Sequence, residues 1–462
     1  MAELIRLYNT ITRKKEAFRP IHAGNAGLYS CGPTVYWYQH IGNMRTYVFS
    51  DILKRVLLYH GFRVKHVINV TDVGHLTSDA DTGEDKIERA AKKEGKTARE
   101  ISEYYFKIFL QDLKKLNVLQ PNAWPKASRH IKEQIELIKK LEEKGYTYKT
   151  QDGIYFDTSK FKDYGRFSKL KKSGVIAGKR IALGEKKNNT DFALWKFSGM
   201  PGLRQQEWQS PWGLGFPGWH LECSAMSMKY LGSRFDIHTG GMDHIQIHHT
   251  NEIAQSEAAT GKKFVNYWLH GAWLLFKGRK VSKSKDGLYT ISELENLGFQ
   301  PLAFRYLCLG THYKKPLRFT IENLKSAENT YQRLKKIISA LKDDKKTNGK
   351  YLEDFKKVIN EDLDMPGALQ VLWALIRDKK ATGKLRTIKK MDRVLGLDLL
   401  KKDRTKIPDQ IKKLVKQREQ LRKNKQWQEA DEIRKKINNL RYVLEDTKGG
   451  VVVKKRQDVK EN

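Results

Sequence analysis

Four side chains that can bind a metal ion are spread over distant parts of the sequence. Cys31 and Cys223 each lie beside a turn that contains glycine or histidine, and His248 and Glu252 lie four residues apart in a stretch typical of a helix. Residues at positions i and i+4 share a helix face, so this imidazole and this carboxylate can converge on one ion. Two thiolates, one imidazole and one carboxylate suit tetrahedral Zn²⁺. The spacing alone leaves a second interpretation open, in which the cysteines are buried apolar side chains and the His–Glu pair is a solvated helix face.

Two short motifs contain residue types that bind phosphate. The first, His40–Asn43 (HIGN), lies between an expected strand and an expected helix, where backbone N–H groups and the helix dipole favour anions. The second contains Lys280 and Lys283 in a loop of small residues, and two mobile ammonium groups can hold a polyphosphate. An exposed basic loop explains the two lysines equally well.

The elements that must position these residues predict an α/β fold. Leu28–Ser30 is predicted to be a short buried strand, and apolar residues recurring over Asn43–His60 predict a helix that ends before Gly61. Val64–Val70 is predicted to be a second strand. Because a strand, a helix and a strand in this order form a right-handed unit, the two strands are expected to be parallel.

The rest of the chain is predicted to be mostly helical. The predicted stretches are a helical region over 84–116, a helix from a Ser128 cap to Gly145, a Lys- and Gly-rich surface connector over 158–189, and amphipathic helices over 323–341 and 352–381.

Composition and charge narrow the class of protein. The 462 residues include 89 Lys and Arg against 53 Asp and Glu, which gives a net charge of +36. Such a chain attracts polyanions, and nucleic acid is the natural partner, although a Lys-rich proteome would produce the same excess. No apolar run approaches the roughly 20 residues of a membrane-spanning helix. The first residues contain no apolar signal segment, and the three cysteines exclude a disulfide scaffold. We therefore expect a cytoplasmic protein with no membrane partner.

The order of these motifs resembles the cysteinyl-tRNA synthetase family of class I aminoacyl-tRNA synthetases. The matching motifs are CGPTVY at 31–36, HIGNMRTYV at 40–48, NVTD at 69–72, DFALWK at 191–196, GWHLECSAM at 218–226, DIHTGGMD at 236–243, KVSKS at 280–284, RYLCLGTHYKKPLRF at 305–319 and QREQLRKNKQWQEADEIRKKI at 417–437. The resemblance extends over essentially the whole chain.

The resemblance implies a fold and an activity. The fold is a Rossmann-type parallel-sheet catalytic domain with an insertion, followed by an all-α bundle and a small C-terminal anticodon-binding module. The implied activity is the ATP-dependent ligation of L-cysteine to tRNA(Cys) through a cysteinyl-adenylate, carried out by a monomer. The expected regions are the first half of the catalytic domain (1–116), the connective insertion (117–217), the second half of the catalytic domain (218–270), the lysine-loop region (271–318), the bundle (319–400) and the C-terminal module (401–462).

The resemblance also assigns the residues of the site. One Zn²⁺ per chain would be held by Cys31, Cys223, His248 and Glu252, and would select the cysteine thiol. The amino acid would contact Gly32, Thr71, Trp219 and His220. ATP with Mg²⁺ would contact Thr34, His40, Gly42, Asn43, Asp243, Lys280 and Lys283, among which His40, Asn43, Lys280 and Lys283 are the expected catalytic residues.

Two positions depart from the family pattern. Asn43 replaces the final His of the usual HIGH motif and cannot carry charge, and Val281 replaces a Met in the lysine loop. Cys308 is expected to be an inert core residue.

The tail from Lys401 contains 20 Lys and Arg against 10 Asp and Glu. Its apolar positions predict helices that turn Leu414, Leu421, Ile433 and Ile437 inward. Aromatic residues of the tail such as Trp427 and Tyr442 could stack on unpaired bases, although core packing is the expected role of Trp427.

Two other functions remain possible from the sequence. One is the related ligase that joins activated cysteine to an amino sugar and lacks the tRNA-reading tail. The other is a non-catalytic RNA-binding paralogue. The intact basic tail disfavours the first alternative, and the presence of all four candidate zinc ligands and both loop lysines disfavours the second.

Overall fold

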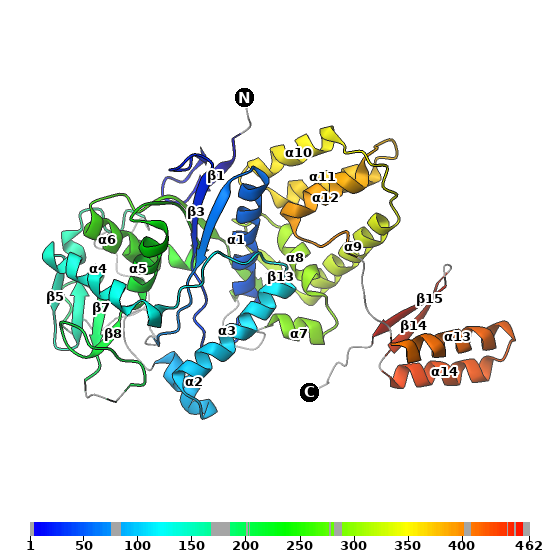
Figure 1. Cartoon of the computed structure of the whole chain (residues 1–462), viewed down its shortest axis with the longest axis horizontal. Coiled ribbons are helices and arrows are strands. Elements are labelled where there is room, and N and C mark those ends of the chain that lie inside the picture. Colours follow the sequence, from blue (N-terminus) through cyan, green and yellow to red (C-terminus); the bar gives the residue numbers. More distant parts are fainter. Residues whose placement is uncertain are drawn as a thin grey trace.

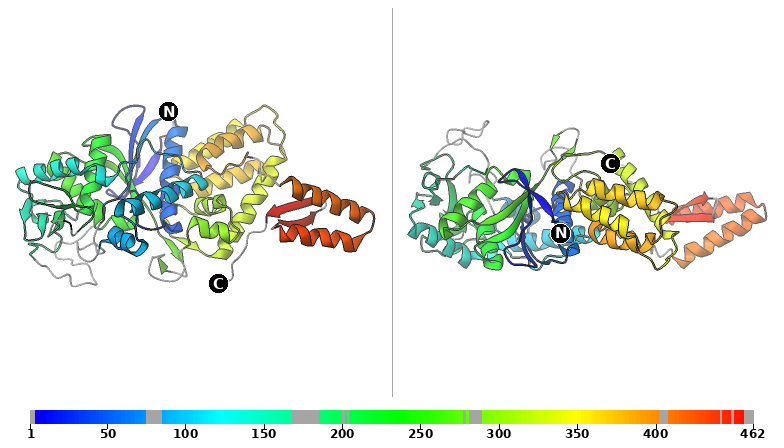
Figure 2. Two further views of the ribbon diagram at one scale, coloured as in Figure 1. Left: turned by 60° about the horizontal axis from the view of Figure 1, so that its bottom comes forward. Right: turned by 90° about the horizontal axis from the view of Figure 1, so that it is seen from above.

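The computed structural model describes residues 4–74, 85–167, 185–199, 202, 204–276, 279–280, 289–401, 408–440, 442–447 and 450–455. The molecule is elongated (Figure 1). An insertion with its own sheet lies at one end, a parallel sheet and a helical bundle lie in the middle, and a small C-terminal module lies at the other end. Both views in Figure 2 show the same order.

A four-stranded parallel sheet forms the centre of the fold, in the order β10-β9-β3-β4. Tyr29 of β3 is the register partner of Val67 on one side and of His238 on the other, and all three neighbouring pairs are parallel. The α/β class and the parallel strand–helix–strand unit predicted from the sequence are therefore confirmed. The bounds are β3 (Asn25–Ser30), β4 (Arg63–Ile68), β9 (Phe235–Gly241) and β10 (Val265–Gly271), and the short pair β1 (Arg6–Asn9) and β2 (Lys14–Ala17) is antiparallel.

Helix α1 (Ile41–Tyr59) connects the first two strands of this unit. It begins two residues before the predicted start, because His40 and Asn43 form a capping box around its first turn. Gly61 follows the helix with a φ of 84°, a conformation that favours glycine, as the sequence predicted.

The helical region predicted over 84–116 consists of two helices. They are α2 (Lys86–Glu94) and α3 (Ala98–Lys115), and Gly95, with a φ of 63°, ends the first of them.

The predicted cap of the next helix is wrong. Ser128 lies in a 3-10 turn (Ala127–Arg129), and α4 (Ile131–Glu143) follows His130 without a side-chain cap. The hydroxyl of Ser128 instead donates to Asp72 Oδ2 at 2.6 Å, so it is not available to cap α4.

The insertion forms a second, antiparallel sheet in the order β5-β6-β7-β8. Side chains of α4 and of this sheet share one apolar core with α5 and α6, which fixes the insertion against the two helices that follow it. The bounds are β5 (Thr147–Lys149), β6 (Gly153–Phe156), β7 (Phe192–Phe197), β8 (Gly215–Pro217), α5 (Trp219–Leu231) and α6 (His248–Thr260). Of the basic connector predicted over 158–189, residues 168–184 lie outside the described residues.

The helical bundle shares one hydrophobic core with the parallel sheet and α1. The amphipathic stretch predicted over 352–381 is helical and consists of two helices, because Asp362 and Leu363 between them both adopt positive φ values, 58° and 59°. The bounds are β11 (Leu274–Phe276), β12 (Arg279–Lys280), α7 (Ile291–Asn296), α8 (Pro301–Leu309), β13 (Leu317–Phe319), α9 (Ile321–Ser339), α10 (Gly349–Asn360), α11 (Met365–Arg377) and α12 (Lys384–Leu395).

The C-terminal module has a separate apolar core. It contains α13 (Asp409–Lys423), α14 (Trp427–Asn439) and a hairpin of β14 (Tyr442–Thr447) and β15 (Gly450–Lys455), which the sequence analysis did not predict. Ile433 and Ile437 are buried in the core and Leu414 and Leu421 pack against it, as predicted. The expected burial of Trp427 is wrong, because 57% of this residue is exposed.

Arg45 joins α1 to two loops that are distant in the sequence. Its guanidinium donates to the carbonyl oxygens of Ala272 at 2.8 Å and Trp273 at 2.6 Å, and to those of Lys315 at 2.6 Å and His312 at 3.4 Å. Burial lowers the pKa of Arg45. One buried side chain therefore connects the helix that begins within the HIGN motif to the segment that precedes the lysine loop.

A buried ion cluster centred on Asp51 joins α1 to the bundle. Asp51 Oδ2 accepts hydrogen bonds from Arg55 at 2.7 Å and from Arg305 of α8 at 2.6 Å, and Asp51 Oδ1 accepts one from the backbone N–H of Leu119 at 2.8 Å. Burial alone would raise the pKa of Asp51, but the two arginines outweigh burial and lower it. The pairing therefore contributes to stability above the pKa of an unfolded Asp, about 3.9, and this contribution is lost as the pH falls below that value.

Replacing Asp51 with Asn is expected to lower the free energy of unfolding by about 3–5 kcal/mol at pH 7, because it leaves two buried guanidinium groups without their carboxylate. Urea denaturation followed by circular dichroism measures this loss. The matched control is Asp163→Asn, which removes an exposed ion pair with Arg166 and should cost less than about 1 kcal/mol. Similar losses in the two variants would contradict a special role for the buried cluster.

Among the described residues, no helix has both the length and the apolar character that crossing a membrane requires. The three cysteines are free and buried. Burial raises the pKa of Cys308 to about 12, which agrees with the inert core role expected for it.

Candidate active site and metal centre

A cavity of about 490 Å³ lies where the four parallel strands end. Cys31 follows β3, Asn69 and Thr71 follow β4, Asp243 follows β9, and Ala272 follows β10, and all of them line the cavity. Parallel sheets bind ligands at the carboxyl ends of their strands, so this position is the expected one for a site.

Most of the residues predicted from the sequence meet at this cavity. Those that line it are Cys31, Gly32, Thr34, His40, Gly42, Asn43, Thr71, Trp219, Cys223, Asp243 and His248. Lys283 lies outside the described residues. The backbone of Lys280 pairs with Leu275 of β11, next to Leu274, which lines the cavity.

The four candidate metal ligands come together beside the cavity: Cys31, Cys223 and His248 line it, and Glu252 is buried behind them. Cys31, Cys223, His248 and Glu252 each offer one ligand atom, and these atoms all lie within 4.8 Å of one another. Cys31 follows a strand, Cys223 lies in α5, and His248 and Glu252 occupy successive turns of α6. The i,i+4 pair converges as predicted, with His248 Nε2 3.1 Å from Glu252 Oε1.

The electrostatics of this cluster suit a cation. A hydrogen bond to Cys31, burial and the nearby Glu252 carboxylate together raise the pKa of the Cys223 thiol well above its usual range. Burial would also raise the pKa of Glu252, but His238 and His248 lower it to about 2. Two buried thiols crowded against a buried carboxylate can all be deprotonated together only if a positive charge lies between them. The donor set thus fits a divalent ion that accepts sulfur, nitrogen and oxygen ligands.

His220 occupies a different place from the one expected. It is only 3% exposed and does not line the cavity; instead its Nδ1 lies 2.9 Å from Nδ1 of His248. A metal-binding histidine usually places its second ring nitrogen against such a partner, which fixes the orientation of the ring. His220 therefore supports His248 from behind the cavity wall.

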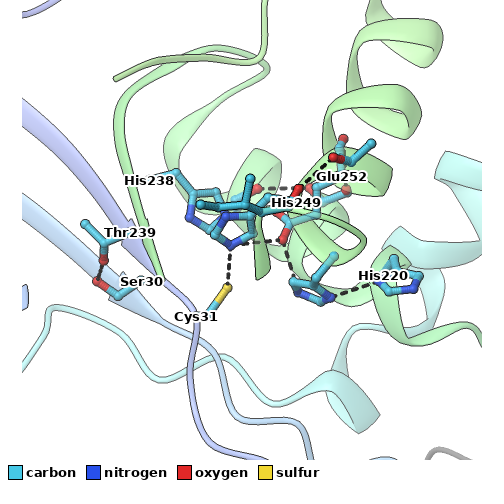
Figure 3. A network of polar contacts seen from close by, with 12 residues as sticks. Ser30, Cys31, His220, His238, Thr239, His249 and Glu252 are labelled. Atoms are coloured by element: carbon cyan, nitrogen blue, oxygen red, sulfur yellow. Dashed lines mark hydrogen bonds and ion pairs between the residues drawn. The ribbon is translucent and has the colours of Figure 1, made fainter. Parts of the chain in front are cut away.

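Buried histidines that the sequence analysis missed surround the candidate metal ligands. Figure 3 shows His238 beside Glu252 and His249 beside Cys31. His238 Nε2 lies 2.8 Å from Glu252 Oε2, and His249 Nε2 lies 3.1 Å from Cys31 Sγ. A signal was present in the sequence, since His238 lies near the end of a buried strand whose carboxyl end faces the site.

These histidines create a second possible donor set, formed by Cys31, His238, His249 and Glu252. His238 and His249 are fully buried and do not line the cavity, whereas Cys223 and His248 do line it. An ion that a bound molecule must reach therefore fits the set that includes Cys223 and His248. The second set lies behind it.

Gly32 brings the backbone close to the strand end of β4. A Cβ at this position would lie 1.5 Å from the carbonyl oxygen of Asn69, so only glycine fits. The Gly32 N–H donates to Asn69 Oδ1 at 2.7 Å, and Thr71 Oγ1 donates to Glu222 Oε2 at 2.8 Å. These bonds give the wall next to Cys31 a fixed shape.

The first turn of α1 presents the HIGN motif to the cavity. His40 Nδ1 accepts a hydrogen bond from the Asn43 N–H at 3.2 Å, and Asn43 Oδ1 accepts one from the His40 N–H at 3.3 Å. Because Nδ1 is an acceptor, the proton of the neutral His40 ring lies on Nε2. Asn43 thus helps to cap the helix through its amide group, and this role needs no charge. The helix N-terminus beside Asn43 favours anions.

Comparison with known proteins identifies the family. The family model for the class I (C) catalytic domain of tRNA synthetases matches residues 17–329, and the model for the cysteinyl-tRNA ligase anticodon-binding domain matches residues 404–459. The cysteine–tRNA ligase 1 of Burkholderia lata is 48% identical over 450 residues, which cover 96% of each chain. The chain belongs to the cysteine–tRNA ligase family. Its members include the cysteine–tRNA ligase of Treponema denticola, which is 42% identical over 98% of this chain and 99% of its own.

Solved structures agree with the fold expected for a cysteine–tRNA ligase. The methionyl-tRNA synthetase of Mycobacterium tuberculosis, solved with methionyl-adenylate, superposes with a TM-score of 0.54 at 13% identity and covers 81% of this chain and 90% of its own. This similarity supports the class I fold. The match to an anticodon-binding domain also disfavours the amino-sugar ligase, which lacks such a tail.

Proposed function

We propose that the protein ligates L-cysteine to tRNA(Cys) in two steps, with a cysteinyl-adenylate as the intermediate. One observation carries the proposal: two thiols and an imidazole that share a cluster with a buried carboxylate line the cavity that also contains the start of α1. A thiol-selective site and a phosphate-binding helix terminus in one cavity suit the activation of cysteine by ATP. We further propose that the protein acts as a cytoplasmic monomer.

Cys31, Cys223, His248 and Glu252 would hold one Zn²⁺. When bound, Zn²⁺ with thiolate ligands prefers a soft sulfur ligand over a hydroxyl and lowers the pKa of a thiol that binds to it. This matters because cysteine and serine differ in one atom, and an apolar pocket separates such near-isosteres by only about 1–3 kcal/mol. His220 orients the ring of His248, and His238 holds the Glu252 carboxylate.

At the α1 end of the cavity, the carboxylate of cysteine would attack the α-phosphate of ATP. A bond forms between the carboxylate oxygen and phosphorus, and pyrophosphate leaves with the electrons of the broken P–O bond. His40 would donate from Nε2 to a phosphate oxygen, and the N-terminus of α1 would attract the anion. Lys280 and Lys283, with Mg²⁺, would stabilise the charge that develops on pyrophosphate. Asp243, which accepts a hydrogen bond from the Trp273 indole, would bind the ATP ribose.

The second step would transfer the cysteinyl group from the adenylate to the 2′-hydroxyl of the terminal adenosine of tRNA(Cys): an ester bond forms at the 2′-oxygen, the bond between the carbonyl carbon and the phosphate oxygen breaks, and AMP leaves. The C-terminal module would bind the anticodon. Its exposed Trp427 lies beside the Arg422 guanidinium, 5.8 Å from guanidinium carbon to ring centroid, and this pair offers a stacking surface for an unpaired base. Lysines and arginines along α13 and α14 would contact phosphate groups.

A cysteine-dependent exchange of pyrophosphate into ATP tests the first step. We expect exchange with cysteine, negligible exchange with serine, and about one zinc per chain by metal analysis. Charging of tRNA with cysteine, compared with transfer to an amino sugar, tests the second step. Exchange without tRNA charging would favour the amino-sugar ligase, and absence of exchange would contradict the proposed activity.

A further inference from the structure

Lys86, the first residue of α2, lines the cavity and has no role in the proposed function so far. Its ammonium group lies 5.8 Å from the centroid of the Trp219 ring. Among the described residues that line the cavity, Lys86 is the one lysine, and no arginine accompanies it. A molecule in the cavity therefore meets the ammonium group of Lys86 on this side.

Trp219 places this charge next to the candidate metal centre. The Trp219 ring lies 5.1 Å from the ring of His248 between centroids, and it lies 5.8 Å from the ring of His220. Lys86 and the metal-binding His248 thus contact the same indole ring. A small ligand bound to the metal cluster through one end would extend past Trp219 within reach of Lys86.

The first turn of α2 is held firmly, which fixes the position of the Lys86 backbone. Asp85 caps the helix, and its Oδ1 accepts from the N–H groups of Ile87 at 2.8 Å and Glu88 at 3.0 Å. The Asp85 carboxylate is buried and forms an ion pair with Arg204 of the insertion. The Arg204 guanidinium in turn stacks on Phe216, 3.7 Å from the ring centroid. The insertion therefore anchors the helix that presents Lys86.

We propose that Lys86 binds the α-carboxylate of the amino-acid substrate while the substrate thiol is held by the metal cluster. This inference rests on the proposed function, since it takes cysteine as the substrate. Free cysteine carries one anionic group, its α-carboxylate, close to its sulfur. A lysine on the cavity wall beside the sulfur site can form a charge-assisted hydrogen bond with this carboxylate. Lys86 would thereby position the carboxylate that attacks ATP and would select amino acids over thiols that lack a carboxylate.

The test compares two thiols that differ only in the carboxylate. Dissociation constants for cysteine and for cysteamine, which has no carboxylate, are measured on the zinc-loaded full-length protein by isothermal titration calorimetry. Lys86→Met keeps the aliphatic stem over Trp219 and removes the charge, and we expect it to weaken cysteine binding by about 10- to 100-fold while cysteamine binding changes less than about twofold. Lys86→Arg should restore most of the affinity for cysteine.

Lys93→Met is the matched control. Lys93 lies on the same helix, with its ammonium 5.7 Å from the Trp37 ring centroid, but it does not line the cavity. This variant should bind both thiols as the unmodified protein does. Zinc content and circular dichroism establish that each variant retains its metal and its fold.

The outcomes separate the two proposals. Equal weakening of cysteine and cysteamine in Lys86→Met would show a structural effect and overturn the carboxylate contact, as would unchanged cysteine binding. An unmodified protein that binds both thiols, with a Lys86→Met variant whose affinities for both are unchanged, would remove the role of Lys86 alone. An unmodified protein that binds neither thiol would overturn the proposed function and the role of Lys86 with it.

Discussion

Replacing Cys223 with serine is expected to remove zinc from the purified protein and to abolish its preference for cysteine over serine. The hydroxyl of serine is a far poorer ligand than a thiolate at neutral pH, and the other three ligands would be left with an incomplete tetrahedral set. We expect the zinc content to fall from about one to below about 0.1 per chain, and cysteine-dependent pyrophosphate exchange to fall at least about 100-fold.

The matched control is Cys308→Ser. It makes the same chemical change at a buried cysteine of the core around α1 and α8, whereas Cys31 and Cys223 belong to a different hydrophobic core. This variant should retain zinc and exchange activity and lose only a small amount of stability. Metal analysis and exchange with cysteine or serine measure both variants. A Cys223→Ser protein that keeps its zinc and still rejects serine would refute the ligand assignment.

Ending the chain after Lys401 is expected to separate the two steps of the reaction. The buried side chains of the C-terminal module pack against one another, so its removal leaves the core shared by the sheet and the bundle intact. Adenylate formation should therefore remain within about twofold of the full-length rate. Charging of tRNA should fall at least about 100-fold in kcat/KM, since stacking on one base is worth about 1–3 kcal/mol and the phosphate contacts are lost as well.

A single substitution in the full-length chain complements this truncation. Trp427→Ala removes an exposed side chain and should lower the kcat/KM for tRNA charging by about tenfold or more without affecting exchange. Steady-state charging assays and exchange assays measure the two steps separately. Equal losses of exchange and charging in the truncated protein would show that the module is needed for folding of the catalytic region.

The sequence predicted the central unit of the fold because its local signals agree with its tertiary environment. Apolar periodicity and Gly61 define α1, and the strands beside it are short apolar runs. The wrong helix cap arose where a distant residue decided the outcome. Ser128 is a suitable helix cap by residue type, but its hydroxyl donates a hydrogen bond to Asp72, which lies 56 positions away. The break between α10 and α11 occurs at Asp362 and Leu363. Both residues adopt a left-handed backbone conformation, which their residue types do not predict.

The candidate site could be predicted from the sequence only in part. The i,i+4 spacing of His248 and Glu252 places them on one helix face, and the structure agrees. Spacing could not bring Cys31 and Cys223 to the same place, because that requires the order of the strands and the packing of α5; only the family resemblance supplied it. Burial of Trp427 was expected from its residue type, but this side chain is exposed and lies outside the apolar core of the module.

The hydrogen bonds of the Arg45 guanidinium determine which substitutions the protein can tolerate in this region. All four acceptors of its guanidinium are main-chain oxygens, which every amino acid supplies. Substitutions can therefore be made at residues 272, 273, 312 and 315 without loss of these hydrogen bonds. A substitution of Arg45 removes all of them. We therefore expect Arg45 to be conserved among related proteins, whereas the residue types at the four contacted positions can vary.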